Sequence, residues 1–181
     1  FMNTYDLIQD MTFSQARDWT AGTKVTYHVK DWFSVTGSLH ADFYDRFKRH
    51  ERIDKRQKDY ESSIYQPRLT VTSNYFNGHS LILGMEHTSD ELTSDRFSGN
   101  ANHDLKTRAL KETEYFLQDE WTINPRWMIS VGIRTNFSKA FGFMGMPKVA
   151  AKYSPDKHWS LRANYSMGYR SPSIKELFYN W

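Results

Sequence analysis

Polar and apolar side chains alternate along much of this chain, most clearly in the segment that begins at residue 159. One set of alternate positions is mostly apolar or aromatic: Trp159, Leu161, Ala163, Tyr165, Met167 and Tyr169. The positions between them are polar or small: Ser160, Arg162, Asn164, Ser166, Gly168 and Arg170. Because successive side chains of a strand point to opposite faces, the pattern predicts a sheet with one apolar and one polar surface. It runs for about 11 residues, which is the length that a tilted strand needs to cross a bilayer.

The same alternation recurs in seven earlier segments, which we expect to be strands: 22–29, 32–47, 62–76, 80–88, 112–123, 127–136 and 148–153. Tight turns are expected at 30–31, 77–78, 124–126 and 154–157, and Asn77-Gly78 is the strongest short hairpin signal among them. The other connections are looser and mostly longer. The sequence therefore predicts an all-β protein, an antiparallel up-and-down meander of about eight strands.

The four tight turns carry a second signal, because aromatic residues flank each of them: Trp32 and Phe33, Tyr75 and Phe76, Trp121 and Trp127, and Tyr153 and Trp159. Amphipathic rings prefer the headgroup level of a bilayer, and bacterial outer-membrane barrels combine short turns at one end with long loops at the other. The pattern favours a membrane girdle over the alternative, aromatic packing at the rim of a soluble sandwich. The charged stretches 46–61 and 89–111 are expected to be long loops.

Three stretches fit the alternation less well. Pro67 lies inside an expected strand and cannot donate to a ladder, so a bulge or local break is expected there. In the segment 112–123 neither set of alternate positions is cleanly apolar. Residues 1–18 show no clear alternation and are expected to be a strand end and a loop.

Composition narrows the class of protein. The chain has 181 residues, 39% hydrophobic and 16% aromatic, with a mean hydropathy of -0.74 and no cysteine. Such a value suits an outer-membrane barrel, since half of each strand faces a polar lumen. No apolar run approaches the roughly 18 residues of a membrane helix, and no N-terminal signal pattern is found. A net charge of +3 does not call for nucleic acid as a partner.

The segment 168–178 reads G-Y-R-S-P-S-I-K-E-L-F and resembles the G-[FY]-R-[AS]-P-[ST]-[IL]-x-E-L-[FY] motif of TonB-dependent outer-membrane receptors. The hairpin 115–134 and the segment 148–155 (K-V-A-A-K-Y-S-P) also resemble that family. The resemblance covers residues 112–178 well, and before them it rests on the rhythm of strands and turns.

Such receptors have a barrel of about 22 strands whose lumen is filled by an N-terminal plug. The resemblance implies that residues 1–181 are one internal segment of the barrel, about a third of its strands, with plug and remaining strands absent. It implies a location in the outer membrane of a Gram-negative bacterium and TonB-energised uptake of a large scarce nutrient: a ferric siderophore, haem or cobalamin. The chain would supply barrel wall and extracellular loops. Its expected partners are outer-membrane lipids, the nutrient, and TonB through the absent plug; no catalysis and no cofactor are expected.

Arg134, Arg162 and Arg170 fall on the polar face, together with Lys148 and Lys152. In a receptor of this kind the polar face lines the lumen and touches the plug. Plug contact or lumen solvation is the favoured role for these residues, and direct ligand contact is the less favoured one. Arginine suits either role because its guanidinium forks onto carboxylates and carbonyls.

Other polar clusters are weaker candidates. An oxygen-rich group fits no EF-hand spacing, and a solvated loop is favoured over a calcium site: Asp90, Glu91, Asp95, Asn100, Asn102 and Asp104. The basic stretch 48–58 is read as a solvated loop rather than a site for lipopolysaccharide phosphates. The seven histidines, at 28, 40, 50, 79, 87, 103 and 158, leave a haem ligand possible but unsupported.

Two other classes of protein remain open: a small closed eight-stranded outer-membrane anchor or adhesin, and a soluble all-β binding module. The soluble module requires the apolar positions of 127–133 to be buried against a second sheet, so their exposure discriminates between the classes.

Overall fold

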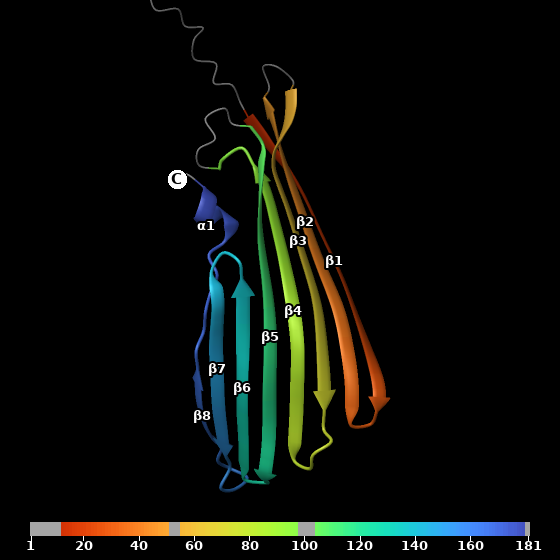
Figure 1. Ribbon diagram of the computed structural model, residues 1–181, viewed down its shortest axis with the longest axis vertical. Coiled ribbons are helices and arrows are strands. Elements are labelled where there is room, and N and C mark those ends of the chain that lie inside the picture. Colours follow the sequence, from red (N-terminus) through yellow and green to blue (C-terminus); the bar gives the residue numbers. More distant parts are fainter. Residues whose placement is uncertain (1–11, 51–54, 98–103, 180–181) are drawn as a thin grey trace, which may run out of the picture.

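The chain forms one antiparallel sheet of eight strands that follow one another in sequence order (Figure 1). The computed structural model describes residues 12–50, 55–97 and 104–179. The strands are β1 (Thr12–Lys30), β2 (Phe33–His50), β3 (Lys55–Ser73), β4 (His79–Ser94), β5 (Lys106–Asn124), β6 (Trp127–Ser138), β7 (Gly142–Tyr153) and β8 (Leu161–Ser166). A short helix, α1 (Ile174–Phe178), follows β8. The predicted all-β meander of about eight strands is confirmed.

The sheet is an open wall within the described ranges. Each strand pairs with its sequence neighbours, and no pairing joins β1 to β8. A small closed eight-stranded barrel would need that pairing, so this alternative is not favoured. Among the described residues, no helix is both long and apolar enough to cross a membrane.

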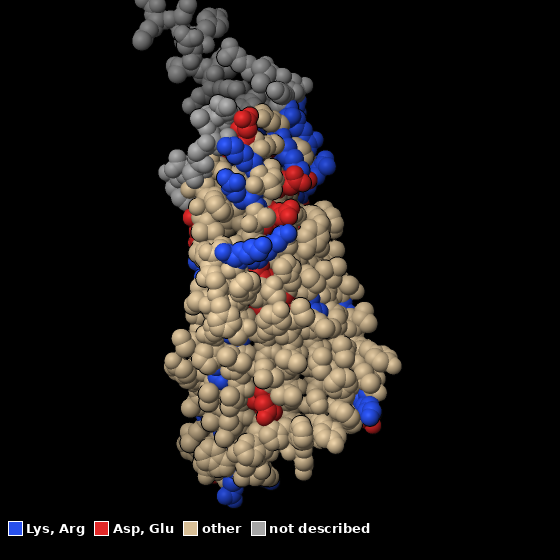
Figure 2. Space-filling model, viewed as in Figure 1, with Lys and Arg blue, Asp and Glu red and all other residues tan. Residues whose placement is uncertain are grey.

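The two faces of the sheet differ as the alternation predicts. The register places the following residues on one side, which we call the apolar face: Val25, Leu39, Leu69, Leu83, Leu117, Val131 and Tyr165. Val131 is 51% exposed and Ile133 47%, so no second sheet covers this face. Figure 2 shows a surface with few charges over its middle and with lysines and arginines gathered at one end. These exposures contradict a soluble sandwich.

Aromatic rings mark both limits of the apolar face. At the tight-turn end, Trp32 contacts Tyr75 at 4.8 Å between centroids, and Trp127 stacks on Tyr153 at 4.4 Å. Towards the far end, Trp19 stacks on Phe43 at 4.2 Å. Trp32, just before β2, and Phe43 are eleven residues apart, so the two aromatic levels are separated by about 36 Å along the strand at 3.3 Å per residue. A strand tilt of about 40° reduces this to about 28 Å, close to the apolar band of outer-membrane barrels.

The strands run further than the alternation predicts. β1 starts at Thr12, β2 continues to His50, and β4 continues to Ser94. The expectation that 46–61 and 89–111 are long loops is therefore wrong for most of both stretches. Beyond the aromatic ring both faces meet polar surroundings, so the apolar–polar contrast disappears while the backbone ladder continues. Residues 1–11, 51–54 and 98–103 lie outside the described residues.

Pro67 breaks one ladder without shifting its register. It pairs with Leu39 of β2, whereas the β3–β4 pairing passes from Tyr65–Ser89 directly to Arg68–Glu86. A local break is thus present at Pro67. The bulge of β3 lies elsewhere: Arg46 of β2 pairs with Tyr60 and Phe47 pairs with Lys58, so Asp59 is the extra residue of β3.

The ambiguous segment 112–123 is assigned by its cross-strand partners. Leu117 pairs with Leu83 and Ile133 on the apolar face, which places Phe116 on the polar face. Phe116 covers Gly84 opposite it: a Cβ added to Gly84 would lie 2.3 Å from Phe116 Cζ. The aromatic residue that obscured the pattern therefore fills the space left by a glycine.

The last strand is shorter than predicted, because β8 has only six residues, Leu161–Ser166. Met167 N donates to Pro147 O at 3.0 Å, but Pro147 has no N–H to donate in return, and the β7–β8 ladder ends there. Tyr169 and Arg170 lie beyond the strand, so the prediction that Arg170 belongs to its polar face is wrong.

Candidate functional site

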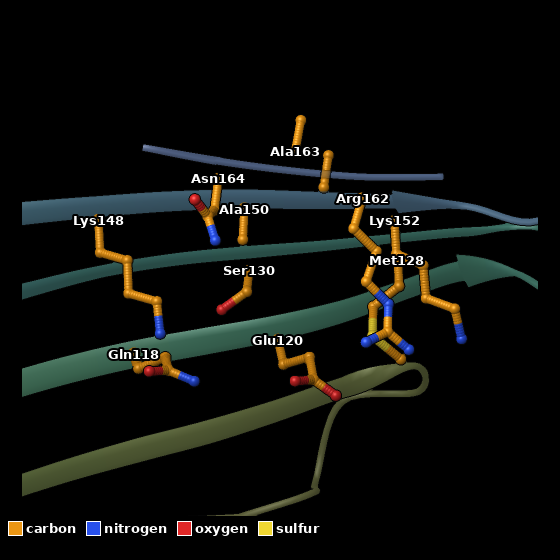
Figure 3. A pocket seen from close by; sticks show the side chains of 11 residues that line it. Gln118, Glu120, Met128, Ser130, Lys148, Ala150, Lys152, Arg162, Ala163 and Asn164 are labelled. Carbon is orange, nitrogen blue, oxygen red and sulfur yellow. The ribbon is translucent and has the colours of Figure 1, made fainter. Parts of the chain in front are cut away.

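The polar face carries a cluster of three cations near the tight-turn end. Lys148 and Lys152 of β7 and Arg162 of β8 line a hollow of about 330 Å³ together with Glu120 of β5. Figure 3 shows these side chains on the same side of the sheet. Lys152 and Arg162 are direct cross-strand partners, and two like charges in this position destabilise the pairing of β7 and β8.

The charges of this cluster are not balanced by ion pairs within the part of the chain that the structure describes. No ion pair within 4.0 Å joins Lys148, Lys152 or Arg162 to a carboxylate there. The hollow thus offers positive charge to a carboxylate or another anion. We call Lys148, Lys152 and Arg162 the basic cluster.

Arg134, by contrast, is neutralised within the wall. Its Nε donates to Glu114 Oε2 at 2.7 Å, and its Nη2 also contacts that oxygen. Next to it, Arg68 pairs with Glu86 at 3.2 Å and lies over the Phe116 ring, 4.9 Å from its centroid. These contacts give Arg134 a place in a structural network that joins β3, β4, β5 and β6, whereas Arg162 belongs to the basic cluster.

Arg170 holds the turn that leads into α1. Its Nη2 donates to Glu176 Oε1 at 2.8 Å, and its side chain is 79% exposed. Glu176 also accepts from the Ser173 backbone N–H at 2.8 Å, while the Ser173 hydroxyl accepts from the Glu176 N–H. These hydrogen bonds, first from the Ser173 backbone and then from its hydroxyl and Arg170, hold the pKa of Glu176 below its usual range.

The segment after β8 continues towards the far end of the sheet, where α1 lies (Figure 1) and packs on the polar face. Ile174 is 2% exposed and packs in one cluster with Tyr60, Leu92 and Phe97, from β3, β4 and the residues after β4. Further contacts fix the segment: Tyr179 Oη donates to Ser94 Oγ at 2.9 Å, and Ser171 Oγ donates to Glu112.

Sequence reasoning missed this docking, although one signal for it was present. Ser173-x-x-Glu176 is a capping box, a sequence signature of a helix start, and Ile174 directly follows its first residue. The place where the helix docks could not be found, because its contacts lie between 59 and 114 residues earlier in the chain.

A clamped carboxylate lies beside the docked helix. Asp59 is 3% exposed; it accepts from Arg46 Nη2 at 2.8 Å and pairs with Lys48 Nζ at 3.0 Å. Burial opposes ionisation of this carboxyl, but the hydrogen bonds from Arg46 and Lys48 outweigh it and lower the pKa of Asp59. The carboxylate therefore stays charged and ties β3 to β2.

The oxygen-rich group predicted from the sequence does not assemble into a metal site in the described part of the chain. Asp90 and Glu91 are successive strand residues of β4 and point to opposite faces, while Asn100 and Asn102 lie outside the described residues. Within the described ranges, no group of three histidine or acidic side chains could hold a metal ion.

Comparison with known proteins identifies the family. The model of the "TonB dependent receptor-like, beta-barrel" family matches residues 2–181, and the chain belongs to this family. The iron-regulated outer membrane virulence protein of Vibrio cholerae is 24% identical over 160 residues, which are 85% of this chain and 22% of that protein. The siderophore receptor PirA from Pseudomonas aeruginosa has the same fold, with a TM-score of 0.53 and 13% identity over 88% of this chain and 36% of its own.

Family membership places the chain in the outer membrane of a Gram-negative bacterium and gives each face of the sheet a surrounding. The apolar face is the lipid-facing surface, and the polar face with the basic cluster lines the lumen. The chain spans about a fifth of the length of the curated relative it matches.

Proposed function

We propose that this chain forms part of the wall and extracellular rim of a receptor that takes up a ferric siderophore with energy relayed by TonB. The names of two similar proteins support a ferric siderophore, rather than haem or cobalamin, as the nutrient. One relative is called iron-regulated, and the solved neighbour is called a siderophore receptor. Haem and cobalamin are the other nutrients of the same class. In this proposal residues 1–181 are an internal segment of the barrel, and a plug domain fills the lumen beside it.

The orientation follows from the turns. Outer-membrane barrels have short periplasmic turns and longer extracellular loops. We therefore assign the tight-turn end, with Trp32 and Trp127, to the periplasmic side, and α1 with the far end of β2–β5 to the extracellular side.

The observation that carries the proposal is the unbalanced positive charge on the lumen-facing wall. A water-filled pore would solvate such a cluster, whereas a filled lumen presents carboxylates and backbone carbonyls to it. We propose that Lys148, Lys152 and Arg162 bind acidic groups of the plug. Arg134, already paired with Glu114, would support the wall rather than bind.

Uptake by the complete receptor tests the proposal. The receptor is expressed in a Gram-negative strain that lacks its own receptors for these nutrients. Cell-associated iron is measured with ferric siderophores or haem supplied, and cell-associated cobalt is measured with cobalamin supplied. We expect accumulation of a ferric siderophore that disappears when TonB is deleted. Uptake that persists without TonB, or uptake of none of the three nutrients, would overturn it.

A variant pair tests the role of the basic cluster. Lys152→Gln/Arg162→Gln should lower uptake several-fold, because the plug loses charge-assisted contacts. Arg126→Gln/Lys157→Gln removes the same charge from two exposed periplasmic turns and should leave uptake unchanged. Equal uptake by both double variants would show that the cluster is only solvated.

A further inference from the structure

The polar face of the sheet changes character from one edge to the other at a single height. The row of cross-strand partners that begins at Lys148 of β7 passes through Gly132, Gln118, Ile82 and Thr72 and reaches Ser34 of β2. One end of this row belongs to the basic cluster, whereas its members on β3 and β2 carry hydroxyls. The lumen is therefore bordered by two different surfaces at the same level.

Five residues on the polar face of β1–β3 form what we call the hydroxyl strip: Thr26, Ser34, Thr36, Thr70 and Thr72. They are cross-strand neighbours in two adjacent rows, and the hydroxyl oxygens of Thr26 and Thr36 lie 3.0 Å apart. Lys24 and Arg68 lie one row further from the tight-turn end, and Arg68 is paired with Glu86. The strip itself is therefore polar and uncharged.

These two surfaces differ in how strongly they hold a plug. Hydrogen bonds that involve a charged group are roughly twice as strong as those between neutral groups. Carboxylates and carbonyls of a plug bind the basic cluster through charge, whereas at the strip they meet hydroxyls that bond to one another, as Thr26 and Thr36 do, or to water. A plug that moves during transport therefore separates from the strip more easily than from the basic cluster.

The position of α1 favours the same side of the lumen. α1 follows β8, and its residue Ile174 packs against Tyr60 and Leu92 near the far ends of β3 and β4. Figure 1 shows α1 beyond the ends of β6–β8, whereas β1 and β2 form the opposite edge of the sheet. A solute that moves from the far end towards the basic cluster must therefore pass α1.

We propose that the passage for the iron chelate opens along the hydroxyl strip, between the plug and β1–β3, while the plug stays attached to the basic cluster. Oxygen atoms of the chelate accept hydrogen bonds from the hydroxyls, which replace part of its hydration and are weak enough to release it. This inference rests on the proposed function, because it requires a plug and an iron chelate, and it adds the side of the lumen that the chelate uses.

Labelling of cysteine variants of the complete receptor in cells tests the route. Ser34→Cys places a thiol on the strip, and Ser130→Cys places one in the hollow of the basic cluster, each in a receptor without other cysteines. A small, membrane-impermeant thiol reagent is added with a mixture of ferric hydroxamate, catecholate and citrate chelates. The presence of TonB should raise the labelling rate of Ser34→Cys about fivefold or more and that of Ser130→Cys by less than about twofold.

Removal of the hydroxyls is the second test. Thr36→Val/Thr70→Val keeps the shape of the strip but removes two hydroxyls, and it should lower the rate of iron uptake about threefold or more. Thr23→Val/Thr135→Val is the matched control, because both threonines lie on the apolar face, and it should leave uptake near the wild-type rate. Heat-modifiable mobility on a gel shows whether each variant is folded.

The outcomes distinguish this inference from the uptake proposal. Cells that accumulate iron but show equal labelling changes at both cysteines, or a larger rise at Ser130→Cys, would overturn the route and leave the uptake proposal standing. Unchanged uptake by Thr36→Val/Thr70→Val would likewise overturn the role of the hydroxyls. Cells that accumulate no iron from the mixture would overturn both proposals.

Discussion

His79 Nδ1 lies 2.7 Å from Asp119 Oδ2 on the apolar face, and the imidazole stacks on Trp121 at 5.2 Å between ring centroids. The pair joins β4 to β5 next to the aromatic residues of the tight-turn end. Asp119 has Leu81 and Val131 as its cross-strand partners, so its carboxylate lies among lipid-facing apolar residues. The hydrogen bond to His79 thus offsets the cost of placing the Asp119 carboxylate on this apolar face.

This pair predicts an asymmetry between single and double variants. His79→Leu leaves Asp119 without its partner and should destabilise the barrel by about 1–3 kcal/mol. His79→Leu/Asp119→Leu removes both polar groups from a lipid-facing surface and should be neutral or stabilising. Denaturant unfolding of the complete receptor from lipid vesicles measures both. A double variant as unstable as the single one would contradict this account.

Docking of α1 depends on one buried side chain. Ile174→Ala removes the side chain at the centre of the Tyr60–Leu92–Phe97 cluster and should weaken docking by about 2–4 kcal/mol. Leu177→Ala is the matched control, because Leu177 belongs to the same helix and is 37% exposed. Hydrogen exchange should rise over residues 171–179 in the first variant and stay near wild type in the second. Similar exchange in both would mean that Ile174 does not hold the helix.

Gly84 is expected to resist substitution more than another strand glycine. A Cβ at Gly84 would meet Phe116 Cζ at 2.3 Å and Leu69 O at 2.7 Å, so Gly84→Ala should cost about 1–3 kcal/mol. Gly37 has nothing within 4 Å of an added Cβ, and Gly37→Ala should be neutral or slightly stabilising. The unfolding assay used for the histidine variants compares them directly, and equal effects would refute the steric explanation.

The Asp59 clamp predicts that the stability of the far end of β2 and β3 depends on pH in the acid range. The folded pKa of Asp59 is depressed, so its contribution to stability is present above its unfolded pKa of about 4 and is lost as pH falls through the folded value. Hydrogen exchange of residues 44–49 and 56–62, corrected for intrinsic rates, should therefore increase between about pH 5 and pH 3.

Two substitutions serve as tests of the same clamp. Asp59→Asn should raise exchange at neutral pH and remove most of the acid dependence. Asp45→Asn should change little, because the Asp45–Lys58 pair is a more exposed surface ion pair. Acid dependence that survives in Asp59→Asn would assign it to another group.

The sequence predicted the part of the sheet between the two aromatic levels well and the part beyond Phe43 poorly. Between the aromatic rings, each residue such as Val131 or Ser130 meets either lipid or lumen, so polarity reports the face directly. Beyond Phe43 both faces are polar, and strands held by contacts such as Asp59–Arg46 look like charged loops. The three arginines predicted from the sequence show the same limit. All fall at polar positions of the alternation, but Arg170 lies beyond the end of β8, and only cross-strand partners separate Arg134 from Arg162.

In the proposed orientation, the extension of β2 and β3 beyond the aromatic level has a consequence for any molecule that approaches from outside. Past Phe43, β2 continues for seven residues to His50, or about 23 Å along the strand. This stretch is hydrogen-bonded to β1 and β3, and α1 is fastened to the inner surface of β3–β5. The described strands on this side therefore form a stiff wall, and a solute that enters beside them would leave bulk water well before it reaches the level of the hydrocarbon.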